Sequence, residues 1–195
     1  MMTQALREPS DPGSTERRTR RLKLTGYALA IWSFAYALPH LYWALGGRMG
    51  MIAIHPAAPD LPQWRQINWV ATIGFSALSL LGLAFRPLAN GRIGRPIILL
   101  IALIGCSLAV SHAFYGIGSR TLTVIRAFAR SQDVPVFVLV DLLIFEPWFL
   151  IQGMLLGLCG WFSLASTKGR RRWLAACAGA TLVALAAALL NLRIY

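Results

Sequence analysis

The feature that most constrains this chain is its division into long apolar segments. A helix needs about 20 apolar residues to cross ~30 Å of hydrocarbon, and the segments have that length. The chain is 57% hydrophobic and 13% charged, with a mean hydropathy of +0.60, whereas soluble domains carry about 25% charged residues. Too few polar side chains remain to cover a surface that faces water. The sequence therefore predicts an all-α polytopic helix bundle in the cell membrane.

Five segments are predicted to span the membrane after a polar N-terminal tail. Residues 1–24 end in a basic cluster and cannot bury a core, so we expect a disordered cytoplasmic tail. The fourth span is longer than one crossing requires, and Pro147 is the natural place for it to bend or break. The predicted bundle, 25–195, has spans at 25–45, 67–85, 96–117, 136–166 and 173–192.

The basic residues divide unevenly between the two sides of these spans. The positive-inside rule then predicts a cytoplasmic N-terminus and an external C-terminus. The net charge of +12 lies at the ends of apolar segments, so membrane topology explains it and no nucleic-acid partner is expected. Residues 119–132 place apolar and arginine side chains on different sides, which predicts a short helix lying in the outer membrane interface.

The polar residues within the spans gather in the outward-facing half of the membrane. His40 and His112 lie about one turn from the outer ends of the first and third spans, and Asn68 opens the second. Asp141 enters the fourth span from outside, and Glu146 lies deeper. A charged residue of this kind costs about 2.5–3.5 kcal/mol at a helix centre. It therefore indicates a functional site or, alternatively, a bond that locks the bundle, such as Asp141 with one of the histidines.

The two acids do not share a face of a straight helix, because five residues correspond to about 140° of rotation. Pro147 lacks the amide that would bond to the Leu143 carbonyl, and it disfavours helical geometry at Glu146. A kink at this point could turn both acids into one cavity. Desolvation would then favour the protonated form of the Glu146 carboxyl.

Aromatic side chains accompany these polar groups at helical spacing. Tyr36 and Trp43 share a face of the first span with His40, and Tyr115 shares a face with His112. These rings are predicted to wall a pocket that opens outward, although packing or lipid-facing rings have the same spacing. The predicted catalytic residues are Glu146, Asp141, His40 and His112, and the predicted substrate-binding residues are Tyr36, Trp43, Asn68, Tyr115 and Trp148.

Two motifs resemble a known family. "PHLYWALGG" at 39–47 and "FEPWFLIQGMLLGL" at 145–158 are similar to a family of small bacterial multi-pass membrane proteins of unknown function. In that family a His and a Trp precede a double glycine, and a Glu-Pro-Trp follows late in the chain. The resemblance covers about 25–166 and implies a membrane bundle in which His40, Trp43 and Glu146 stand out. It implies no reaction.

The first functional hypothesis is an integral membrane enzyme that acts on an apolar, isoprenoid-like substrate. Cyclisation or isomerisation needs a positioned acid and an aromatic wall that stabilises cationic charge. The layout is similar to that of small integral-membrane terpene cyclases and sterol isomerases, by architecture alone. No cofactor is predicted for such a reaction.

Other hypotheses remain open. His40 and His112 could ligate a haem from two sides or lie beside a quinone in a redox subunit. A non-catalytic accessory protein or a small transporter would also fit, although the chain has neither inverted repeats nor paired broken helices. No HxxH or HExxH spacing exists in the sequence, so no metal site is predicted.

Overall fold

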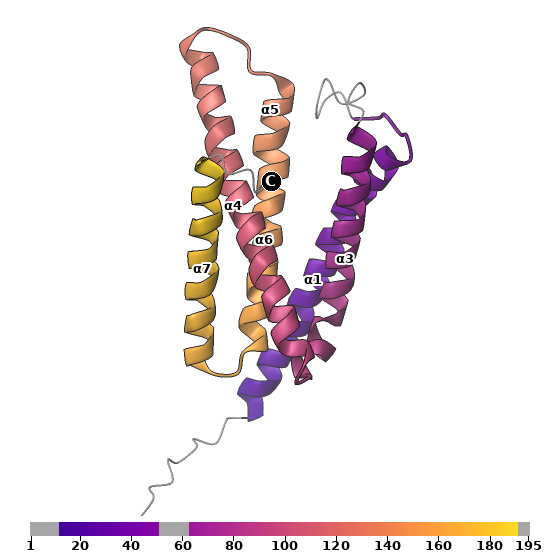
Figure 1. The fold of residues 1–195 in the computed structure, drawn as a ribbon, viewed down its shortest axis with the longest axis vertical. Helices are drawn as coiled ribbons and strands as arrows, with labels where there is room; N and C mark the ends of the chain where they lie inside the picture. Colours follow the sequence, from indigo (N-terminus) through magenta and orange to yellow (C-terminus); the bar gives the residue numbers. More distant parts are fainter. Residues whose placement is uncertain (1–11, 51–62, 191–195) are drawn as a thin grey trace, which may run out of the picture.

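The computed structural model describes residues 12–50 and 63–190, and the regular elements within these ranges are helices (Figure 1). Within residues 63–190 the connections between the long helices are short, and these helices run in alternating directions (Figure 1). The elements are α1 (Pro12–Ala44), α3 (Trp64–Asn90), α4 (Gly94–Ala129), α5 (Val136–Val140), the π-helix η2 (Asp141–Phe145), α6 (Glu146–Ser163) and α7 (Thr167–Leu189).

Four helices are long and apolar enough to cross a membrane: α3, α4, the continuous helix Val136–Ser163 and α7. The chain thus has the composition of a membrane protein with multiple spans. The helix α1 is not among the four, because Ser33, Pro39, His40 and several Tyr and Trp residues lower its mean hydropathy. The predicted total of five spans is therefore not established by composition, and it stays a prediction.

The helix α1 begins earlier than the sequence predicts. It starts at Pro12, so the part of the expected disordered tail from residue 12 to 24 is helical, while residues 1–11 lie outside the described part of the chain. A proline is well accommodated in the first turn of a helix. The Arg, Lys, Leu and Glu residues that follow have high helix propensity, and they continue directly into the apolar part of α1.

The helix α4 also extends beyond its predicted end. It continues to Ala129, so most of residues 119–132 prolong the third span and do not form a separate interfacial helix. No proline interrupts this stretch, and the backbone hydrogen bonds therefore continue through it.

The fourth and fifth spans meet at a sharper boundary than expected. α6 ends at Ser163, and α7 begins at Thr167 instead of residue 173. The side chain of Ser166 caps α7 by accepting a hydrogen bond from the Gly169 amide at 3.1 Å. Residues 191–192 of the predicted last span lie outside the described residues.

The helices form two packed groups, one of α1 and α3 and one of α4, α6 and α7 (Figure 1). Contacts between α1 and α6 connect the two groups. α1 packs along α3, where Gly26 and Gly82 let the two backbones touch. α4 packs against α6 and α7, and Gly153 of α6 lies against the α4 backbone at Cys106. Glycines at these crossings allow the close helix approach that is typical of membrane bundles.

The apolar core occupies one half of the bundle. Its fully buried members include Leu29, Phe85, Ile98, Leu156 and Cys159. These residues lie toward the end at which α1 begins, α3 ends and α7 begins, which is at the bottom of Figure 1. We call this the basic end, because Arg17–Lys23, Arg86–Arg95 and Lys168–Arg172 flank it. The polar residues predicted to form a site lie in the other half.

Candidate functional site

A polar ladder joins α4 to the fourth span in the half opposite the basic end. His112, Gly116 and Arg120 follow one another at intervals of four, so they share one face of α4. Arg120 Nη2 lies 2.8 Å from Asp141 Oδ2 in an ion pair. His112 Nε2 lies 3.8 Å from Glu146 Oε2, and the carboxyl of Glu146 packs directly against Gly116, where no side chain occupies the space. Each acid is therefore matched to a different base on α4.

The π-helix η2 puts the two acids on the same side of the fourth span. The Glu146 amide donates to the Asp141 carbonyl, an i→i+5 bond, so the two residues lie one π-turn apart. The predicted break is present, but it is this wide turn before Pro147 and not a kink at Pro147 itself. Pro147 is the second residue of α6 and has no amide, so the π-turn lies beside a position where the continuous helix lacks one backbone donor.

Glu146 is buried without a hydrogen-bond partner for one oxygen. Its exposed fraction is 5%, and Oε2 accepts no hydrogen bond from the described residues. The 3.8 Å separation from His112 Nε2 is too long for a hydrogen bond. An unsatisfied buried carboxyl is costly and uncommon in folded proteins, so it needs a reason such as a ligand or a catalytic role.

His40 presents a second unsatisfied atom. Asn68 is fully buried, and its side-chain amide donates to the Trp64 carbonyl at 2.8 Å, which leaves Oδ1 to accept from His40 Nδ1 at 2.7 Å. This network assigns the Nδ1–H tautomer to a neutral imidazole, so Nε2 carries a lone pair. No described residue hydrogen-bonds to Nε2, which is buried.

Tyr36 is the centre of an aromatic cluster built from α1, α3 and α6. Its ring centroid lies 4.5 Å from Phe75, 4.9 Å from His40, 5.5 Å from Trp148 and 5.5 Å from Phe149. Only 7% of Tyr36 is exposed. The predicted aromatic wall is thus a packed set of rings that surrounds one of the two histidines.

The two histidines do not face each other across open space. The His40 ring stacks with Phe75 at 6.5 Å, Phe75 lies 6.1 Å from Phe149, and Phe149 lies 4.4 Å from His112. Two phenyl rings therefore occupy the region in which a haem held from both sides would lie. Within residues 12–50 and 63–190, no three His, Cys, Asp or Glu side chains come close enough together to hold a metal ion.

The remaining predicted residues occupy different positions. Trp43 is buried beside His40 and donates to the Met49 carbonyl at 3.0 Å. Trp148 stacks on Trp32 at 4.0 Å, and its Nε1 has no hydrogen-bond partner in the described part of the chain. Tyr115 is 44% exposed and takes no part in the ring contacts around Tyr36.

A buried hydrogen-bonded pair separates this site from the apolar core. Ser33 lies about one turn before Tyr36, and Gln152 lies one turn after Trp148. Gln152 Nε2 donates to Ser33 Oγ at 2.9 Å, and both residues are almost completely buried. The pair fixes α1 against α6 at the base of the aromatic cluster.

Several residues of this arrangement are missing from the sequence-based list, namely Arg120, Gly116, Ser33, Gln152, Phe75 and Phe149. The spacing of His112, Gly116 and Arg120 at i, i+4 and i+8 was a usable signal. Arg120 instead counted among the charges beyond the end of a span, because the third span was predicted to end at residue 117.

The fold is that of a multi-span α-helical membrane protein, with a cluster of buried polar residues in one half of its bundle. Residues 33–156 match the family described as "Protein of unknown function (DUF3995)". The chain belongs to this family, because the match covers more than half of it. The matched region contains the polar ladder, the aromatic cluster and the Ser33–Gln152 pair, whereas α7 lies outside it. Comparisons with curated proteins and with solved structures find no match.

Proposed function

We propose that this chain is an integral membrane enzyme that uses Glu146 to protonate an apolar, isoprenoid-like substrate dissolved in the bilayer. The observation that carries this proposal is the Glu146 carboxyl, which is 5% exposed and has an oxygen without a hydrogen-bond partner in the described residues. The Trp148 and Phe149 rings follow it on α6, and Tyr36 of α1 packs against both. An acid beside aromatic faces is what carbocation chemistry requires.

The proposal includes an orientation. Most Lys and Arg residues lie at the basic end, so the positive-inside rule places this end in the cytoplasm, with α1 as a further span. The ladder and the aromatic cluster then lie in the outer half of the membrane. A substrate without a diphosphate, already dissolved in the bilayer, can reach this half laterally.

The proposed reaction balances without a cofactor. The Glu146 carboxyl gives its proton to one carbon of a carbon–carbon double bond, and the π-faces of Tyr36 and Trp148 stabilise the cation that forms. The cation then loses a proton from a neighbouring carbon to the Glu146 carboxylate that the first step leaves. The product is an isomer of the substrate, Glu146 is protonated again, and its carboxyl proton exchanges with water between turnovers.

The structure favours different roles for the two acids. Asp141 is already paired with Arg120 at 2.8 Å, so we assign it to positioning the π-turn and not to proton donation. The same ion pair, together with the Ser33–Gln152 bond, favours the second candidate function, a non-catalytic accessory protein whose polar residues only lock the helices. A haem between His40 and His112 is disfavoured by the intervening Phe75 and Phe149 rings.

Native mass spectrometry of protein released from its own membrane, with a visible spectrum of the same sample, tests the proposal. We expect the wild-type chain to retain an apolar isoprenoid-like lipid. Substrate and product are isomers of equal mass, so chromatography of the released lipids is needed, and we expect it to show the unreacted isomer in Glu146→Gln. The matched control is Glu16→Gln, which removes an exposed carboxyl at the basic end. A chain without bound lipid, unchanged by Glu146→Gln, would favour the accessory role, and a Soret band would favour the histidines as haem ligands.

A further inference from the structure

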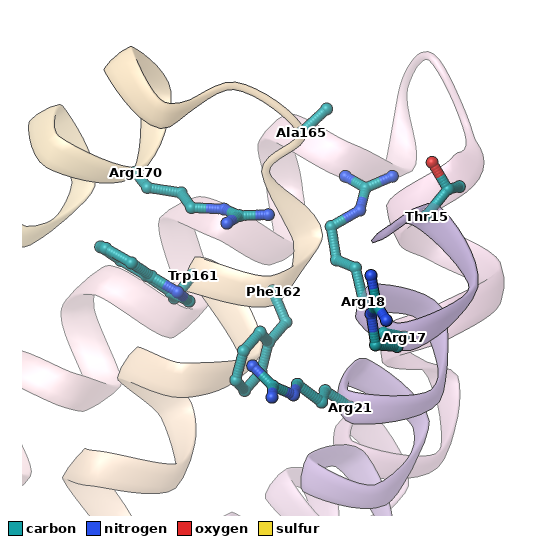
Figure 2. A pocket seen from close by; sticks show the side chains of 8 residues that line it. All are labelled: Thr15, Arg17, Arg18, Arg21, Trp161, Phe162, Ala165 and Arg170. Atoms are coloured by element: carbon teal, nitrogen blue, oxygen red, sulfur yellow. The ribbon is translucent and has the colours of Figure 1, made fainter. Parts of the chain in front are cut away.

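A second feature of the molecule lies at the basic end, far from Glu146. A cavity of about 520 Å³ opens between the start of α1, the end of α6 and the start of α7. α1 contributes Arg17, Arg18 and Arg21, and α7 contributes Arg170. Figure 2 shows arginine side chains entering from both helices, on either side of the α6 side chains. Two separate helices thus bring positive charge to one cavity.

Arg170 is held in place for binding. Its Nε donates to the Leu164 carbonyl at 3.0 Å, and its guanidinium lies over the Trp161 ring at 5.7 Å (Figure 2). These two contacts fix the plane of the guanidinium and leave its terminal nitrogens available. A planar guanidinium with two terminal donors matches the oxygen pairs of a phosphate.

Arg18 and Arg21 carry positive charge without compensation from the described protein. Neither side chain forms an ion pair or a hydrogen bond within residues 12–50 and 63–190. The positive-inside rule explains why arginines are frequent at this end. It does not explain why arginines of α1 and α7 line one cavity, or why one of them is oriented by two specific contacts.

The apolar part of the lining indicates what the ligand carries besides its anion. Trp161 and Phe162 form a wall of the cavity at the end of a spanning helix, where tryptophan is typical of the membrane–water interface. The cavity also lies beside the capped N-terminus of α7, whose dipole favours an anion. A phosphate attached to a hydrophobic tail satisfies all these groups at once.

We propose that this cavity binds a phosphate ester, and specifically the headgroup of an anionic phospholipid. Arg18, Arg21 and Arg170 bind the phosphate oxygens, and Trp161 and Phe162 contact the glycerol and the first part of the acyl chains. The proposal is independent of the reaction at Glu146 and requires only that the basic end lies at a membrane surface.

Native mass spectrometry of the full chain in detergent, titrated with phosphatidylglycerol, tests this site. A juxtamembrane arginine contributes about 1 kcal/mol to the attraction of an anionic lipid, or roughly fivefold in affinity. We therefore expect Arg18→Gln/Arg21→Gln to weaken binding by about tenfold or more, and Arg170→Gln to weaken it by several-fold. Phosphatidylcholine, whose phosphate charge is internally compensated, should bind much more weakly than phosphatidylglycerol.

The matched control is Arg171→Gln/Arg172→Gln, which removes two exposed charges from the same end but outside the cavity lining. We expect it to retain most of the binding. Equal weakening by both double variants would show a diffuse electrostatic attraction and would overturn the site. If glycerol phosphate bound as tightly as the lipid, the cavity would still be a phosphate site, but the proposal that its ligand is a lipid would be overturned. A melting temperature equal to that of the wild-type chain would exclude misfolding of each variant.

Discussion

Gly116 leaves the space that the Glu146 carboxyl occupies. A Cβ at this position would overlap the Glu146 carboxylate. Gly118, two residues later on α4, has open space around it and offers a control. The pair separates a packing effect at the site from a general effect of removing a glycine from a helix.

We expect Gly116→Ala to destabilise the protein by about 1–3 kcal/mol, because a well-packed site has no room for an added methyl group. Gly118→Ala should be neutral or slightly stabilising, because alanine favours helix. Thermal unfolding in lipid nanodiscs measures both. Adding Glu146→Ala to Gly116→Ala should restore part of the lost stability, and purely additive effects would contradict the packing described here.

The residue scale also shows what a single sequence can and cannot reveal. The sequence gives the depth of each polar or aromatic residue within its own span. This depth was enough to select His40, Asn68, Glu146 and Trp148. The partner of Asp141 could not be selected in this way. Arg120 comes from another helix, and neither the register of α4 against η2 nor the true end of α4 can be read from one helix alone.

At the scale of elements, α1 and α6 are joined by the buried Ser33–Gln152 pair. We expect Ser33→Ala to cost about 1–3 kcal/mol, because it leaves the Gln152 amide buried without its partner. The double variant Ser33→Ala/Gln152→Leu should recover most of this loss, because both polar groups are then removed. Unfolding of the two single variants and the double variant gives the coupling, and a coupling near zero would mean that the bond contributes nothing.

The π-turn makes a second prediction at this scale. A π-turn accommodates one extra residue between two α-helices, so deleting Ile144 from it in a Pro147→Ala background should leave a regular helix and keep both flanking registers. Deleting the equally exposed Met154 within α6 in the same background should rotate everything beyond it by about 100°. We expect a monodisperse, folded protein only from the first deletion, measured by size-exclusion chromatography and melting. Equal tolerance of both deletions would contradict the assignment of the extra residue to η2.

The helices could be predicted where apolar composition alone decides. They could not be predicted where composition and helix propensity point to different structures. Long apolar segments identified α3, α4, the fourth span and α7. The start of α1 was missed because charge and polarity suggested disorder, although helix propensity and continuity with an apolar helix favoured order. The break in the fourth span was located from Pro147, but its form depends on how Asp141 and Glu146 pair with α4.

At the scale of the whole molecule, the bundle has an apolar core in one half and a polar site in the other. If the basic end is cytoplasmic, a cysteine at Lys168 should react with a membrane-impermeant maleimide only after the cells are opened. A cysteine at Gln132, in the turn after α4, should react in intact cells. The native cysteines are buried and give little background. The reverse pattern would place the site in the cytoplasmic half and overturn the proposed orientation.

The central proposal is that Glu146 gives a proton to an apolar lipid, and deuterium transfer from heavy water tests it most directly. Membranes that contain the wild-type chain, Glu146→Gln or Glu16→Gln would be incubated in D₂O. Their apolar lipids would then be separated by chromatography and their masses measured by mass spectrometry. We expect one isoprenoid-like lipid to gain a deuterium with the wild-type chain and with Glu16→Gln, and to remain unlabelled with Glu146→Gln. Labelling that is the same in all three membranes, or absent with a folded wild-type chain, would contradict the proposal.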